Sequence, residues 1–164
     1  MERRRVSQSL YRELPSPRRV ALLTKLISER KEIRAVYIAR MSKRGGFRAV
    51  TLQTWPAAKL AQEVVRMNAQ TSDDEIDLLQ ALYVDVEPQI QSDFLEAAGV
   101  KADGASIDEA LEPPYCDAAA VRKAATLIRT KHGDNGMHYL RTIARYNPSG
   151  WPGIADVLDG FGVS

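Results

Sequence analysis

One cysteine and two histidines are the residues of this chain best suited to covalent or metal chemistry. Cys116, the only cysteine, directly precedes a predicted helix, where the helix dipole can lower the pKa of a thiol. His132 and His138 are the only imidazoles available as its general base. The alternative is a small residue packed beside its neighbouring prolines. Because no cysteine-enzyme signature surrounds Cys116 and the spacing is not that of a zinc site, we predict no catalytic residue, no metal and no cofactor.

Four acidic residues lie close together after Ser72, at Asp73, Asp74, Glu75 and Asp77. Grouped carboxylates can collect Mg²⁺ for phosphoryl chemistry. Negative charge also favours the first turn of a helix, and Ser72 with Glu75 matches the spacing of a capping box. The start of a helix therefore accounts for this cluster without a metal.

Cations and aromatic rings are interleaved in the first third of the chain, where Tyr37 and Phe47 lie among arginines and lysines. Cations neutralise phosphates and release counterions, and exposed rings stack on bases. The candidate nucleic-acid contacts are Arg18, Arg19, Arg40, Lys43, Arg44 and Arg48. In the alternative interpretation the rings face the core and the arginines form a solvated face or pair with acidic residues of the same molecule.

Trp151 stands between Gly150 and Pro152 in a predicted turn. Tryptophan is enriched at interfaces, so Trp151 is the candidate contact for a protein partner. It suits equally well as a plug at the end of a helical bundle.

Helical periodicity and capping patterns place most of these residues on helices. A helix is predicted from Ser16 to about Arg30, with a proline at its first position, and further helices follow after Pro56. The exception is the stretch at about 33–53, where two runs rich in β-branched and aromatic residues flank the turn-forming cluster Ser42–Gly46. That pattern predicts a β-hairpin with a basic tip.

The predicted fold is α+β and mainly α, a compact helical domain of six to seven helices with one N-terminal β-hairpin. Residues 1–15 are expected to form a basic arm or a short helix, and residues 16–164 a single domain. Two prolines make the region near 100–116 a possible joint within that domain.

Charge is divided unevenly along the chain although its net value is only +2. Met1–Arg48 carries +10, Ala49–Val121 carries −11, and the remainder carries +3. The lone thiol predicts a reducing, cytoplasmic location, and no apolar run is long enough for a signal peptide or a membrane span. No membrane partner is expected.

These features favour a non-enzymatic binding or adaptor protein that contacts nucleic acid through a basic N-terminal helix and hairpin. The alternative is a protein-interaction subunit that assembles with itself or docks to a larger complex through its charge-segregated surface. A small enzyme is the third and least favoured function.

Overall fold

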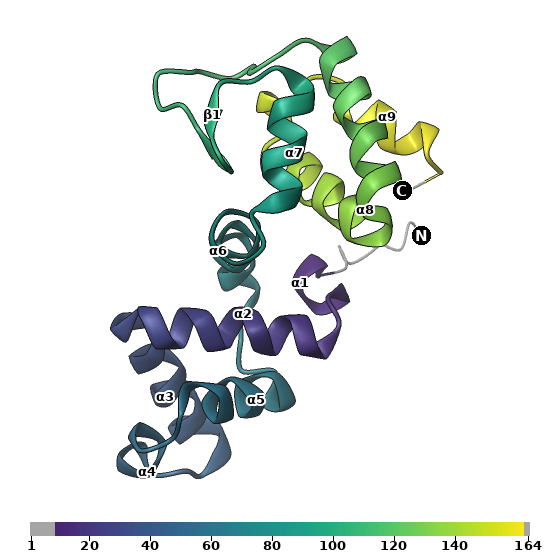
Figure 1. Cartoon of the computed structure of the whole chain (residues 1–164). Helices are drawn as coiled ribbons and strands as arrows, with labels where there is room; N and C mark the ends of the chain where they lie inside the picture. Colours follow the sequence, from purple (N-terminus) through teal and green to yellow (C-terminus); the bar gives the residue numbers. More distant parts are fainter. Residues whose placement is uncertain (1–8, 163–164) are drawn as a thin grey trace. The chain divides into compact units, whose positions relative to one another are not determined.

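The computed structural model describes residues 9–162, and this part of the chain is mostly helical with one very short hairpin (Figure 1). It contains nine α-helices, more than the six to seven expected. The contacts of the chain divide it into two compact units, with the boundary between Ala81 and Leu82. The predicted joint near 100–116 lies inside the second unit, and folding of residues 16–164 as one cooperative domain stays a prediction.

Unit 1 is a bundle in which one long helix packs on another. Its core joins Leu23 and Ile27 on one helix to Leu60 and Val64 on another, four side chains that are almost fully buried. Their spacing of four residues places each pair on one helical face, as the sequence predicts. The elements are α1 (Leu10–Glu13), α2 (Ser16–Glu29), α3 (Lys31–Gly45), α4 (Ala49–Gln53), α5 (Ala57–Met67), the 3₁₀ turn η1 (Ser72–Asp74) and α6 (Glu75–Ala81).

The predicted hairpin at about 33–53 is wrong, because this stretch forms the helices α3 and α4. Tyr37, Ile38 and Met41 are buried on one side of α3 at helical spacing, and their packing outweighs the weaker β preference of the individual residues. The glycines read as a hairpin turn end the helix instead, since Gly46 adopts the left-handed conformation (φ 70°) of a helix C-cap.

A short helix, α1, lies within residues 1–15, where a basic arm or a short helix is expected, and the arginines at positions 3 to 5 lie outside the described residues. Glu75 holds α1 in place. Its carboxylate accepts hydrogen bonds from the backbone N–H groups of Leu10 and Tyr11 at 3.4 Å and from the hydroxyl of Ser9. A carboxylate beside the N–H groups of a helix start is favoured by the helix dipole.

Unit 2 is built around aromatic rings. Phe94 meets Tyr139 and Trp151 edge to face, with ring centroids 5.6 and 4.9 Å apart. Such edge contacts add to the stabilisation from burial alone. The elements are the π-helical turn η2 (Leu82–Val86), α7 (Gln89–Ala98), β1 (Ala102–Asp103), β2 (Ser106–Ile107), α8 (Ala118–Tyr146), the 3₁₀ turn η3 (Pro148–Gly150) and α9 (Ile154–Gly160).

The α8 helix is broken at Gly133, whose φ of 55° and ψ of −131° are not helical. Asp93 on α7 holds the residues just before the break, because its buried carboxylate accepts from Lys131 at 2.9 Å and from His132 at 2.8 Å. The break at Gly133 thus divides α8 into two helical stretches. Within residues 9–162, no helix is both long and apolar enough to cross a membrane.

We expect the change Gly133→Ala to lower the free energy of unfolding by about 1–3 kcal/mol, because a side chain at this φ and ψ is strained. Urea denaturation followed by circular dichroism measures it. The matched control is Gly160→Ala at the end of α9, where an added Cβ meets nothing within 4 Å and φ is not positive. Equal losses in both variants would contradict the strain at Gly133.

Candidate functional site

The α3 helix separates two hollows in unit 1. Its residues Ile33, Val36 and Tyr37 line a pocket closed by α2 and α6, and Ala35 and Ala39 line a cleft closed by α4. The two sets lie on different faces because successive residues of a helix are turned by about 100°. We call these hollows the α3–α6 pocket and the α3–α4 cleft.

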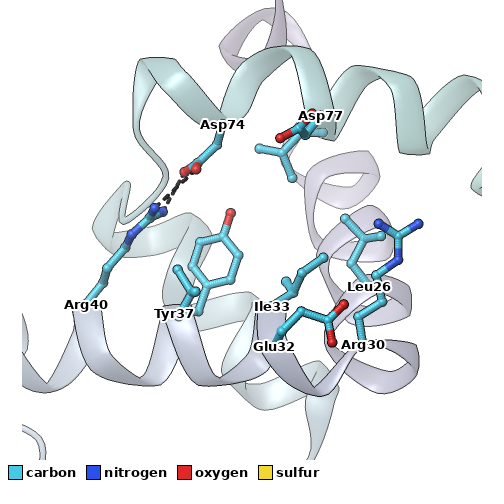
Figure 2. A pocket seen from close by; sticks show the side chains of 10 residues that line it. Leu26, Arg30, Glu32, Ile33, Tyr37, Arg40, Asp74 and Asp77 are labelled. Atoms are coloured by element: carbon cyan, nitrogen blue, oxygen red, sulfur yellow. Dashed lines mark hydrogen bonds and ion pairs between the residues drawn. The ribbon is translucent and has the colours of Figure 1, made fainter.

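The α3–α6 pocket has an apolar floor and charged ends, and its volume is about 270 Å³. Figure 2 shows Asp74 and Asp77 reaching in from the side of α6, with the ring of Tyr37 standing between them and α3. One end is closed by an ion pair, in which Arg40 donates to both oxygens of Asp74 at 2.5 and 3.1 Å. The Arg40 guanidinium carbon also lies 5.3 Å from the centre of the Tyr37 ring.

This ion pair sets the protonation states of the groups around it. Burial opposes the charge of Asp74, but bonds from Arg40 and from the backbone and side chain of Thr71 outweigh it and hold the pKa of Asp74 below its usual value. Burial first, and the charge of Asp74 second, raise the pKa of Tyr37 well above its usual value. At neutral pH Asp74 is therefore ionised and Tyr37 is a neutral phenol.

The lining of the α3–α4 cleft is basic, whereas that of the α3–α6 pocket carries charges of both signs, and the cleft has a volume of about 410 Å³. Arg34 spans one side of it and donates to the backbone carbonyls of Gln53 at 3.1 Å and Trp55 at 2.7 Å, which fixes the end of α4 against α3. A carbonyl accepts a hydrogen bond without cancelling the charge of the guanidinium. The cleft is lined by Lys31, Arg34, Ala35, Ile38, Ala39, Ala49 and Gln53, and this lining includes no carboxylate.

The whole of residues 33–62 contains no aspartate or glutamate, and we call it the acid-free segment. It forms most of α3, all of α4 and the first half of α5. Its six cations are Arg34, Arg40, Lys43, Arg44, Arg48 and Lys59. Arg40 is the member that the described structure pairs with a carboxylate. The segment thus keeps most of its positive charge.

An aromatic pair lies within the acid-free segment. Phe47 and Trp55 meet edge to face with centroids 5.3 Å apart, and the ammonium of Lys59 lies 4.3 Å from the centre of the Trp55 ring. Both rings are partly exposed. Cation–π contact of this kind holds a lysine beside the ring while leaving its charge available.

The structure separates the six predicted nucleic-acid contacts into different environments. Arg19 is bound at the corner of α1 and α2, where it donates to the Leu14 carbonyl at 3.0 Å, and Arg18 lies half-buried beside it. Arg40 is paired with Asp74, which cancels much of its charge, and its contact with a phosphate stays a prediction.

The other three predicted contacts are exposed at the end of α3 and at the cap of α4. Arg44 donates to the Asn68 carbonyl at 3.2 Å. Lys43 and Arg48 have no side-chain bond to any of the described residues. Of the six predicted contacts, Lys43 and Arg48 are therefore the two with the fewest interactions within the described residues.

Trp151 is a core residue of unit 2, with 2% of its surface exposed. It packs on Phe94 and on Tyr115, whose centroid is 5.1 Å away. Its ring is not presented to solvent, which corrects the expectation that it contacts a partner. The alternative interpretation, a plug in the bundle, is the one its burial matches.

The cysteine and histidines do not form a nucleophile and its base in the described structure. Burial first, and the nearby Asp117 carboxylate second, raise the pKa of Cys116, so its thiol is protonated at neutral pH. His138 lies 2.5 Å from the hydroxyl of Tyr83, and His132 lies against Asp93. Among residues 9–162, no group of three or more potential ligands is placed to hold a metal ion.

Three residues of the cleft were missed by the sequence reasoning, namely Lys31, Arg34 and Gln53. The predicted strands put this stretch in a hairpin, where the cleft does not exist. The available signal was the absence of carboxylates from 33 to 62, which the charge totals over longer segments conceal.

Comparison with protein families, with curated proteins and with solved structures finds no match to this chain.

The change Asp74→Asn is expected to lower the free energy of unfolding at pH 7 by about 1–3 kcal/mol, because it leaves the part-buried Arg40 without its counter-charge. The pKa of Asp74 is lowered by folding, so its contribution is complete above the ordinary carboxyl pKa of about 3.9 and is lost as the pH falls further. Denaturation curves of the unchanged protein and of Asp74→Asn should therefore differ at neutral pH and converge in acid.

Asp77→Asn is the matched control, since Asp77 lines the same pocket but is exposed. A loss in this variant as large as that in Asp74→Asn would contradict the role given to the ion pair.

Proposed function

We propose that this protein binds nucleic acid through the acid-free segment of unit 1, in a binding role without a catalytic step. The observation that carries the proposal is six cations and no carboxylate over thirty consecutive residues. Lys43 and Arg48 are exposed, and Arg34 and Arg44 bond to neutral carbonyls, so four positive charges are left uncancelled by these contacts.

The energetic basis is counterion release. Each Lys or Arg that neutralises a phosphate frees a condensed counterion and adds about 0.7–0.9 to the slope of log affinity against log salt concentration. Four or five such contacts make binding strongly salt-dependent. Partly exposed rings at Phe47 and Trp55 add surfaces on which bases stack.

The double change Lys43→Glu with Arg48→Glu is expected to weaken binding at low salt by at least about tenfold and to reduce the salt slope by about 1.4–1.8, the equivalent of two phosphate contacts. Fluorescence anisotropy of a labelled oligonucleotide over a salt series measures both quantities.

The matched control reverses two exposed cations of unit 2, Arg122→Glu with Lys123→Glu, which changes the net charge equally. Thermal melts monitored by circular dichroism establish that all variants fold, and Lys43→Gln with Arg48→Gln supplies a neutral version. Equal weakening by the two reversed pairs, or no binding by the unchanged protein at low salt, would refute the proposal.

A second candidate function is self-association, favoured by a change of sign within unit 1. The acid-free segment is followed by residues 63–77, which hold five carboxylates and one cation. Exposed members of the two segments on different copies attract each other, and such contacts set orientation and association rate.

Light scattering tests self-association. Between about 0.01 M and about 1 M salt the Debye length falls from about 30 Å to about 3 Å, so a charge-driven assembly should dissociate. A mass of 18.2 kDa at every salt concentration would contradict this second function and leave the first intact.

A further inference from the structure

The α3–α4 cleft combines three chemical features in one hollow. Its walls are short apolar side chains, among them Ala35, Ala39 and Ala49, which leave room between the two helices. Gln53 adds a carboxamide with both donors and an acceptor. Lys31 and Arg34 add positive charge, and no carboxylate is present in the lining to cancel it.

We propose that this cleft receives an unstacked base of a single-stranded nucleic acid, with Lys31 and Arg34 binding the attached phosphate. This inference rests on the proposed function and specifies the class of nucleic acid that is bound. The volume of about 410 Å³ lies within the range of small-molecule pockets. A heteroaromatic ring with a polar edge matches apolar walls plus one amide, and a phosphodiester matches two cations.

The strandedness follows from access to the base. In a duplex the bases are stacked and paired, so a base enters a protein hollow only after it has been extruded, at a cost of a few kcal/mol. A single strand offers its bases without most of that cost. The cleft therefore predicts a preference for single strands beyond the electrostatic attraction that every nucleic acid shares.

Arg34 both fixes the end of α4 beside the cleft and contributes positive charge to the cleft. Its two bonds to the carbonyls of Gln53 and Trp55 use one nitrogen of the guanidinium, and the group has five N–H donors in all. Its remaining donors are available to a phosphate while the end of α4 stays fixed. The cleft is thus formed before the ligand arrives, which reduces the entropic cost of binding.

The main competitor is an anionic membrane surface. Val50 on α4 is 76% exposed, and exposed apolar residues beside cations also suit a lipid headgroup region. The apolar alanine walls and the amide of Gln53 favour the nucleobase, because a headgroup needs the cations alone.

The test fills the cleft without removing a charge. Ala39→Leu and Ala49→Leu place larger side chains at exposed positions that line it, and leucine is a strong helix former. The matched control is Ala21→Leu, an exposed position on α2 that lines neither hollow. The probes are a labelled oligonucleotide of about 12 nucleotides, the same sequence as a duplex, and phosphatidylserine vesicles.

We expect each filled variant to lose about tenfold in affinity for the single strand, because one base loses its place in the cleft, and to keep its affinity for the duplex within about twofold. Ala21→Leu should match the unchanged protein on both probes. Filled variants that bind the single strand as well as the control would overturn the inference. A vesicle affinity that falls as much as that for the single strand would assign the cleft to lipid and overturn it as well.

The two proposals fail differently. If the acid-free segment binds nucleic acid without using the cleft, charge reversal at Lys43 and Arg48 weakens the binding of every nucleic acid. Filling the cleft then leaves all of these affinities unchanged. If neither probe binds at low salt, the proposed function itself is wrong. Titration of adenosine monophosphate into isotope-labelled protein gives a second readout. Amide shifts at Ala39, Ala49 and Gln53 that inorganic phosphate does not reproduce support the inference, and equal shifts with phosphate overturn it.

Discussion

The ion pair between Arg40 and Asp74 ties the middle of α3 to the start of α6. Asp74 also accepts from the backbone N–H of Thr71 at 2.8 Å, so one carboxylate both begins a helix and neutralises a cation. This pair helps to define the surroundings of α3. With α3 held on one side by α6 and on the other by Arg34 bound to the end of α4, both hollows beside it are defined.

Arginines in this unit bond either to a carboxylate or to backbone carbonyls, and the two kinds of bond have different electrostatic consequences. The bond of Arg40 to a carboxylate cancels charge, whereas the bonds of Arg34 and Arg44 to carbonyls leave it in place. A guanidinium has enough donors to serve the fold and a ligand together. Structural use of arginine therefore does not by itself remove the positive potential of the acid-free segment.

Local patterns in the sequence predict most helices of this protein but not the site. Gly99 and Gly133 end helices, and Asp117 caps α8, as their types suggest. The capping box uses Thr71 and Asp74, one residue earlier than expected. The prediction fails at 33–53 because the β preference of the residues there disagrees with their helical spacing. Burial of one helical face favours the helix. The cleft depends on where α4 packs, which is a tertiary contact that no short pattern encodes.

Because α3 lines a different hollow with each of two faces, its length affects how this protein tolerates insertions. Ile33 and Tyr37 face one hollow while Ala35 and Ala39 face the other, so the two surfaces are distinguished by rotation about a single axis. One inserted or deleted residue near the start of α3 would turn everything after it by about 100°. An insertion would place Tyr37 at the angular position of Ile38, on the cleft side, and Ala39 at that of Arg40, on the pocket side, so the two linings would be mixed. The length of this helix is consequently constrained more tightly than the identity of most of its side chains.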